Sequence, residues 1–354
     1  MKMRVLRSLI AVCIVLFLSG CWDNRDINHR VLPVVMGVTM KENEYLIYLQ
    51  IPVPSGNTTK TKIVTGAGKT INHAVDKISA NLEDHVDLLH VKVILVDTKY
   101  AQKGLDDIIA DFMRGRDVST KTLIAICDDD MDHFFTSATQ SMEPKGTALY
   151  DFFEKNAGWN PQIALTRVWE VYRSIHSYTR DVAIPVIRSG KTTVVQHIGA
   201  AVVKNGKMVA QINPDETLLF NAFNGESTQG KIEVSNHASV LIISNSITNK
   251  SLMVNSMPIL KSNLKLKVVI LETKGNPTTE TIKQELEDVV KQRFDQMFAK
   301  LQKSGADILG TGQYFRSELS RAELKNWRTK YYSELKLELQ VDAIIENTGF
   351  LNMK

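Results

Sequence analysis

The order of hydrophobic and polar positions predicts alternating strands and helices along most of the chain. The β-rich runs 31–40 and 45–53 flank a polar turn at 41–44, a pattern typical of a hairpin. The polar, glycine-containing stretch 58–69 is expected to be an exposed connection. Beyond it, apolar residues spaced three and four apart mark one face of a helix that Thr70 is placed to cap, namely Ile71, Ala74, Val75, Ile78 and Leu82.

Two buried strands with an amphipathic helix between them follow in the chain. The strands are expected at 91–96 and 122–127. The helix between them carries Leu105, Ile108, Ile109 and Phe112 at helical spacing. This order predicts crossover units stacked on a sheet, and the pattern then becomes mostly helical from 131 to 178.

The periodicity breaks at Pro185 and at the polar run 188–193, and this break is the expected main domain boundary. The chain is accordingly divided into a signal peptide at 1–20, an N-terminal α/β domain at 21–190 and a C-terminal α/β domain at 191–354. A further subdivision within these two halves remains open.

The C-terminal half begins with a predicted hairpin and a short helix. The strands 198–203 and 208–212 flank Asn205-Gly206, a dipeptide suited to a tight primed turn. A short helix is expected over 216–223, and strands at 240–244 and 264–271 follow it.

The longest helix and the clearest strand are expected near the C-terminus. The helix covers about 279–303, ends at Gly305, and carries the apolar stripe Ile282, Leu286, Val289, Phe294, Met297 and Leu301. Ser320 and Glu323 have the spacing of a capping box for another short helix, which carries Trp327. In the last strand Leu335, Leu337, Leu339 and Val341 alternate with polar residues, so one face is expected to meet a core.

The first twenty-two residues have the layout of a bacterial export signal. Lys2, Arg4 and Arg7 precede an apolar run at 9–18, which is about half the length that a membrane-spanning helix requires. Leu18-Ser19-Gly20-Cys21 resembles a lipobox, in which the cysteine thiol receives a diacylglyceryl group and becomes the first residue of the mature chain. An ordinary cleaved signal with a chance cysteine is the alternative. We therefore expect Cys21 to be the lipidation site and to hold the body at a bilayer.

Composition agrees with a tethered globular body. The chain has 354 residues, of which 44% are hydrophobic and 23% charged, which is ordinary for folded domains. Without the three basic residues of the signal, 40 basic residues face 39 acidic ones, so no nucleic-acid-binding surface is indicated. Of the three cysteines only Cys127 would remain free in the mature chain, so no intramolecular disulfide is possible. Its apolar neighbours indicate a buried side chain.

The candidate chemical motifs favour structural roles over catalysis. Gly66-Ala67-Gly68-Lys69-Thr70 lacks the first glycine of a phosphate-binding loop, because Ile63 stands in its place, and a flexible turn with a helix cap is expected. Asp128-Asp129-Asp130 lacks the alternating ligands of a calcium loop, and helix capping before Met131 is expected instead. The histidines show no zinc spacing, and no serine lies in a nucleophile elbow. We therefore predict no catalytic, cofactor-binding or metal-binding residue.

Several short stretches resemble the Ger(x)C family of lipoproteins, the C subunits of nutrient germinant receptors in spore-forming bacteria. They begin at the lipobox and continue in order along the chain: Cys21-Trp22-Asp23-Asn24-Arg25-Asp26-Ile27; His90-Val91-Lys92-Val93 leading to Ala101 and Gly104; Arg116-Asp117; Ile198-Gly199-Ala200-Ala201-Val202; Glu216-Thr217; and Asp307-Ile308-Leu309-Gly310-Thr311-Gly312 with Trp327 downstream. Asp26 stands where glutamate is expected, which is a conservative departure.

This resemblance implies a fold, a location and partners. The fold would be a mixed α/β (α+β) body of several domains, in which separate β-sheets are packed by helices behind a lipoprotein signal peptide. The protein would be a lipid-anchored, non-catalytic subunit on the outer face of the inner spore membrane. Its partners would be a permease-like membrane subunit and a second integral subunit, with the bilayer contacted through Cys21.

Two other classes of protein share parts of this pattern. A solute-binding lipoprotein of a transporter would have the same anchor and α/β domains, and would bind a small ligand between its domains. An exported lipid-anchored enzyme is the second alternative, although no set of acid, base, nucleophile or metal ligands supports it.

Overall fold

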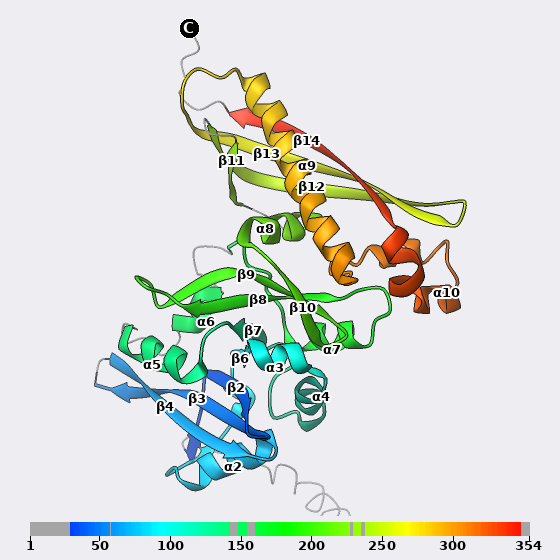
Figure 1. The fold of residues 1–354 in the computed structure, drawn as a ribbon. Helices are drawn as coiled ribbons and strands as arrows, with labels where there is room; N and C mark the ends of the chain where they lie inside the picture. The colour runs from blue at the N-terminus through cyan, green and yellow to red at the C-terminus, as the bar shows by residue number, and fades with distance from the viewer. Residues whose placement is uncertain are drawn as a thin grey trace, which may run out of the picture.

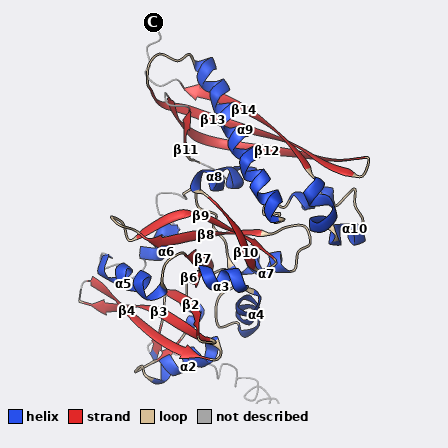
Figure 2. Ribbon diagram, viewed as in Figure 1, coloured by secondary structure: helices blue, strands red, loops and turns tan. Residues whose placement is uncertain are grey.

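A computed structural model describes residues 29–56, 58–141, 148–153, 160–226, 229–234 and 238–347. The fold is mixed α+β, with an eight-stranded sheet, a four-stranded sheet and a small two-stranded sheet, each packed by helices or loops (Figure 1). Figure 2 shows the same separation, with the strands of the two large sheets in different parts of the molecule. The predicted fold class is therefore confirmed. Cys21 and the predicted signal peptide lie outside the described residues.

The predicted first hairpin is present near one edge of the larger sheet. Strand β2 (Val35–Lys41) pairs antiparallel with β3 (Glu44–Ser55). Its turn residues Glu42 and Asn43 both have positive φ values, 52° and 65°, as a type I′ turn requires. Val31, which the sequence placed in this strand, belongs instead to the short strand β1 (Arg30–Val31), which pairs in parallel with β5 (His85–Val86).

The expected exposed connection at 58–69 is wrong, because residues Thr58–Gly68 form strand β4. This strand pairs antiparallel with β3 from Ser55↔Thr58 to Tyr45↔Gly68 and lies at the edge of the sheet. Its alternating threonines and lysines suit an edge strand, where charged side chains hinder pairing with other chains. The polar composition that suggested a loop thus reflects an edge position.

The eight-stranded sheet has the order β10-β9-β8-β7-β6-β2-β3-β4. The strands not yet introduced are β6 (Val93–Asp97), β7 (Leu123–Cys127), β8 (Val182–Ser189), β9 (Val195–Lys204) and β10 (Lys207–Ile212). Neighbouring pairs among β2, β6, β7 and β8 are parallel, so the predicted crossover units are confirmed. The predicted hairpin at Asn205-Gly206 is also present, with both residues at positive φ.

Helices cover both faces of this sheet. One face packs against α2 (Ile71–Ala80), α3 (Thr98–Lys103), α4 (Asp106–Gly115) and α7 (Val168–Ile175). The opposite face packs against α5 (Met131–Ser141) and α6 (Ala148–Phe153). Three separate helices thus occupy the described part of the segment expected to be mostly helical.

The four-stranded sheet has the order β11-β12-β13-β14 and is covered on one face by a long helix (Figure 1). Its strands are β11 (Lys231–Val234), β12 (Ala238–Val254), β13 (Met257–Thr273) and β14 (Lys336–Asn347). The helix is α9 (Thr279–Ser304), which ends as predicted at Gly305 in a left-handed conformation with φ 68°. One residue of the predicted stripe is wrong: Val290, and not Val289, is buried against the sheet.

Helix α8 (Pro214–Phe223) lies between the two large sheets (Figure 1). All of its residues from Glu216 to Phe223 are buried. They share one core with Ala200 and Val202 of β9, the four-stranded sheet and α9. At its rim, Glu216 accepts a hydrogen bond of 2.6 Å from Lys300 of α9. A helix that is covered all round must have neighbours on both sides, so α8 joins the two sheets into one packed unit.

The predicted domain boundary at residue 190 lies in the connection between β8 and β9. These strands pair antiparallel from Val182↔Val203 to Ser189↔Val195, so the eight-stranded sheet continues across this position. The division into 21–190 and 191–354 therefore stays a prediction. Strands from before and after residue 190 are hydrogen-bonded to each other in this sheet.

Candidate functional site: the junction between the two sheets

The glycine-containing motif before α2 serves close packing. A Cβ atom at Gly68 would lie 2.6 Å from the main-chain nitrogen of Ala74, and one at Gly66 would lie 2.5 Å from Cγ1 of Ile78. Thr70 accepts a hydrogen bond of 3.2 Å from the His73 amide, which confirms the predicted cap. The expected flexible turn is wrong, because these glycines let strand β4 lie directly on the helix.

The three aspartates after β7 are bound to neighbouring groups. Asp130 caps α5 by accepting a hydrogen bond of 3.1 Å from the His133 amide, as predicted. Asp129 accepts one of 3.0 Å from the Ser189 amide, and Asp128 one of 3.2 Å from the Thr98 hydroxyl. They line a crevice of about 620 Å³ at the carboxyl ends of β6 and β7. Within the described residues, no group of three or more potential ligands is arranged to hold a metal ion.

The Cys127 side chain lies in the buried strand β7, with no exposed surface. Burial raises the pKa of its thiol to about 12, and the nearby aspartates contribute to the same direction. A thiol that stays protonated at neutral pH is a poor nucleophile. This agrees with the predicted structural role of Cys127.

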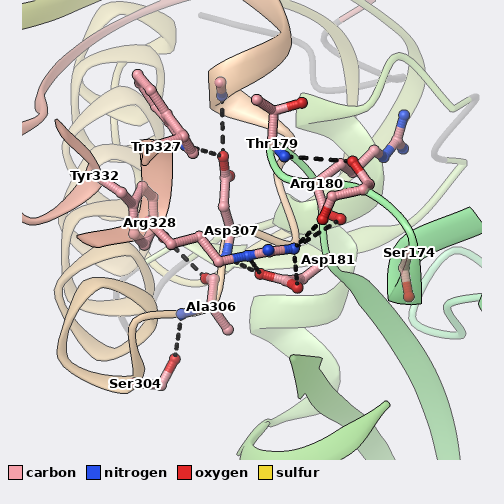
Figure 3. Close-up of polar contacts among 12 residues, drawn as sticks. Ser174, Thr179, Arg180, Asp181, Ser304, Ala306, Asp307, Trp327, Arg328 and Tyr332 are labelled. Atoms are coloured by element: carbon pink, nitrogen blue, oxygen red, sulfur yellow. Dashed lines mark hydrogen bonds and ion pairs between the residues drawn. The ribbon is translucent and has the colours of Figure 1, made fainter. Parts of the chain in front are cut away.

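A buried polar cluster lies at the junction of two bodies (Figure 3). The N-terminal body is the eight-stranded sheet with its helices, and the C-terminal body is the four-stranded sheet with α8, α9 and the segment between α9 and β14. The centre of the cluster is Asp307, which is fully buried just after α9. Its carboxylate accepts four hydrogen bonds of 2.8–2.9 Å, from the Thr311 amide and hydroxyl, the Gly312 amide and Nε1 of Trp327. These donors belong to the short helices η3 (Thr311–Phe315) and η4 (Trp327–Tyr331), so a single carboxylate fixes both of them beside the end of α9.

The backbone of Asp307 joins this cluster to the other body. The Asp307 amide donates a hydrogen bond of 2.8 Å to Oδ2 of Asp181, and its carbonyl oxygen accepts one of 2.8 Å from the Asp181 amide. Asp181 directly precedes β8 of the larger sheet. One main-chain and one side-chain hydrogen bond between the two aspartates therefore join segments that are far apart in the sequence.

Arg328 closes the junction with a bidentate ion pair. Its Nε and Nη2 atoms lie 3.0 Å and 2.7 Å from the two carboxylate oxygens of Asp181. Nη2 also donates to the Ser177 carbonyl oxygen, at 2.7 Å. The Asp181 side chain has no exposed surface and that of Arg328 is 11% exposed. Burying two charges costs desolvation free energy, and the paired hydrogen bonds between the guanidinium and the carboxylate offset this cost.

Burial raises the pKa of Asp307 to about 6, although the four donors act in the opposite direction. Close packing also surrounds the carboxylate, since a Cβ atom at Gly312 would lie 2.7 Å from Nε1 of Trp327. The cluster is thus equipped to fix the relative position of the two bodies.

Sequence reasoning identified only part of this cluster. Asp307 and Trp327 were singled out because they resemble a family pattern, but no role was assigned to them. Asp181 and Arg328 were missed, because they are 147 positions apart and neither has a local pattern that marks a partner. Neither residue belongs to a recognisable motif, so nothing in the local sequence indicated that the two would pair.

Comparisons with known protein families match nearly the whole described body. Residues 23–189 match the sequence model of the spore germination protein N-terminal domain. Residues 198–349 match that of the spore germination B3/GerAC-like C-terminal domain. The junction described above joins these two regions, because Asp181 lies in the first and Asp307 and Arg328 lie in the second.

Curated relatives carry the same assignment. Spore germination protein A3 of Bacillus subtilis (strain 168) is 25% identical over 245 residues, which is 66% of this chain and 64% of that protein. Spore germination protein GerQC of Bacillus cereus is 21% identical over 309 residues, which is 83% of this chain and 84% of that protein. The chain thus matches a little under two thirds of the length of the first relative.

A solved structure has the same fold. The crystal structure of the GerBC protein superposes with a TM-score of 0.59 at 16% identity, and covers 88% of this chain and 97% of that one. Both domain matches, the relatives and this structural similarity agree. The chain therefore belongs to the Ger(x)C (GerAC-like) family of spore germination proteins.

Proposed function

We propose that this protein is a lipid-anchored, non-catalytic subunit of a nutrient germinant receptor on the outer face of the inner spore membrane. It would assemble there with a permease-like subunit and a second integral subunit. The observation that carries the proposal is the pair of family matches, which together reach from residue 23 to residue 349 directly behind the lipobox.

The position of the anchor supports a membrane role. The first described strand, β1, begins at Arg30, nine residues after Cys21. Even a fully extended chain of this length spans at most about 32 Å, so a lipid on Cys21 would hold the β1–β5 edge close to the bilayer. Confinement raises the effective concentration of the body beside its membrane partners, so modest contacts with them suffice. None of the helices in the described ranges is both long enough and apolar enough to cross a membrane.

The structure offers a physical role for such a subunit. The buried joint at Asp181, Asp307 and Arg328 and the enclosed helix α8 hold the two bodies as one unit. A rigid body tethered at one end transmits a displacement at one face to the other face. The buried side chains of Asp181, Asp307 and Arg328 all make hydrogen bonds or ion pairs within this junction.

The deciding experiment compares Cys21→Ala with Cys127→Ala, the matched cysteine variant. Both proteins carry the same C-terminal tag in spores that lack the untagged copy. We expect Cys21→Ala to lose retention in the inner-membrane fraction and to impair nutrient-triggered germination, whereas Cys127→Ala retains both. Normal membrane retention and a normal nutrient response of Cys21→Ala would refute the proposal.

Co-purification tests the proposed partners directly. The tagged protein is isolated from detergent-solubilised spore membranes, and accompanying integral proteins are identified by mass spectrometry. Recovery of a permease-like subunit and a second integral subunit supports the receptor assembly. Recovery of transporter components would instead favour a solute-binding lipoprotein.

A further inference from the structure

A cleft of about 430 Å³ lies beside the junction, between the two bodies. It is bounded by α7, by the segment that joins α7 to β8, and by α8. This volume falls in the range of about 300–1,000 Å³ that is typical of small-molecule sites. Because its walls come from both bodies, a ligand here would contact them simultaneously.

Three arginines line this cleft. Arg167 and Arg173 are at the start and near the end of α7, and Arg180 follows the helix. Nη2 of Arg180 lies 3.5 Å from the amide oxygen of Asn224, and the contacts described for it include no carboxylate. Figure 3 shows its side chain pointing away from the Asp181–Arg328 pair.

Two of these guanidinium groups influence each other. Burial lowers the pKa of Arg173 below its ordinary value, and the positive charge of Arg180 acts in the same direction. Arg173 is stacked over the Trp169 ring, 4.9 Å from its centroid, while the closest carboxylate oxygen described for it, on Glu170, is 4.0 Å away. Two like charges that face one cleft are stabilised when an anion binds between them.

Two acidic residues of the cleft have partners of their own, and one of these partners is Arg173, whose Nη2 lies 4.0 Å from Oε1 of Glu170. Asp181 is paired with Arg328 and accepts from the Asp307 amide. Oε2 of Glu170 accepts a hydrogen bond of 2.9 Å from the Arg167 amide, which caps α7. Glu226 is exposed to solvent at the remaining side. Arg180 has no carboxylate among its described contacts and Arg173 has only this long one with Glu170, so both can receive a ligand's negative charge.

Apolar side chains also line the cleft. Phe220 of α8 and Ile308 of the junction line it, together with Val182 and Ala183 of β8. Asn221 is held in place by hydrogen bonds from Nδ2 to the carbonyl oxygens of Pro161 and Ile163, at 2.8 Å and 3.1 Å. A site lined both by guanidinium groups and by hydrocarbon matches a molecule that has an anionic end and an apolar body.

We propose that this cleft binds a small organic acid, with its carboxylate between Arg173 and Arg180 and its apolar part against Phe220 and Ile308. The inference goes beyond the proposed membrane role, because it concerns a ligand of this chain alone. Guanidinium groups bind carboxylates through paired hydrogen bonds, which gives the site a preferred orientation for its ligand.

The test is a binding measurement on the purified full-length protein in detergent. Acetate, benzoate and succinate are titrated by isothermal calorimetry, with inorganic phosphate as the non-carboxylate anion. We expect at least one carboxylate to bind saturably at one site per chain, and benzoate to bind more tightly than acetate. Arg173→Gln and Arg180→Met, which keeps the aliphatic stem beside Gly310, should each weaken that binding at least tenfold.

The matched control is Arg114→Gln, since Arg114 is an exposed arginine on α4 whose partner is Asp111. It should leave the binding constant unchanged, and unfolding curves of all variants confirm that they remain folded. Absence of saturable binding by all three acids, binding of phosphate alone, or equal affinity of the two cleft variants and the control would each overturn the proposal. None of these results depends on membrane partners, so failure here is distinguishable from failure of the receptor assignment.

Discussion

Nη2 of Arg328 lies 2.7 Å from Oδ1 of Asp181, although the two residues are 147 positions apart in the chain. The contact joins the π-helical turn after α10 (Arg321–Lys325) to the entrance of β8. Asp181 also accepts a hydrogen bond from the Asp307 amide, so one buried carboxylate connects three segments. The pair therefore joins the two bodies directly.

Removing one partner of this pair should destabilise the protein strongly. Asp181→Asn or Arg328→Gln leaves the other charge buried without its counter-charge, and such changes cost about 3–5 kcal/mol. The free energy of unfolding in urea measures the effect. Lys267→Gln is the control, because its pair with Glu346 at 2.8 Å is about half exposed and contributes less than about 1 kcal/mol. Equal effects of the buried and exposed variants would contradict this prediction.

The raised pKa of Asp307 should make part of the stability pH-dependent. Between the ordinary carboxyl pKa of 3.8 and the folded value of about 6, the folded state holds a proton that the unfolded state has released. The contribution of Asp307 is therefore greatest below about pH 4 and declines as the pH rises through 6. Urea unfolding at several pH values should show this decline in the stability difference between wild type and Asp307→Asn.

Asp342 provides a control with the opposite sign. Hydrogen bonds from Asn263 and Gln340 lower its pKa, so its contribution is present above the unfolded pKa and is lost as the pH falls. The stability difference between wild type and Asp342→Asn should thus shrink on acidification. A pH-independent difference for Asp307→Asn would show that this carboxyl does not titrate in the expected range.

Adjacent valines on α9 should respond very differently to truncation. Val290 is completely buried, whereas Val289 is partly exposed. We expect Val290→Ala to cost about 2 kcal/mol, from lost burial and the cavity left behind, and Val289→Ala to cost less than about 1 kcal/mol. Urea unfolding of the two single variants measures both, and a larger loss for Val289→Ala would contradict the observed orientation of α9.

Thiol labelling should show whether Cys21 and Cys127 are accessible to a reagent. Burial and its raised pKa protect Cys127, so iodoacetamide should not modify it at pH 8 until the protein is unfolded. If Cys21 is lipidated as proposed, the native protein purified from membranes takes up no label, and the protein unfolded in urea takes up one. Mass spectrometry of the peptides identifies the site, and a native protein labelled at Cys21 would contradict lipidation of that thiol.

Local sequence patterns predicted those elements whose geometry depends on near neighbours. The Asn205-Gly206 turn, the Thr70 cap and the end of α9 at Gly305 each require particular backbone angles or a side chain within a few residues. Their physical causes therefore lie within the local sequence. The stripe on α9 was one position out at Val289, because an ideal helical period does not fix which of two adjacent valines faces a twisted sheet.

The candidate site could be predicted only in part. The motif 307–312 and Trp327 were visible by resemblance, but their shared role appeared only when the carboxylate of Asp307 was found among their donors. The cleft beside α7 was not predicted, since its walls come from β8, α8 and the segment after α9. Sequence spacing alone carries no information about which of these segments meet.

The sequence by itself determined the alternation of strands and helices, the main turns and caps, and the membership of short motifs in a family pattern. Tertiary structure alone decided that the polar residues 58–68 form an edge strand, that α8 is enclosed between two sheets, and that Asp181 meets Arg328. The physical reason is that turns and caps depend on backbone angles and nearby side chains. Edge pairing, burial and ion pairing depend on partners that only folding brings together.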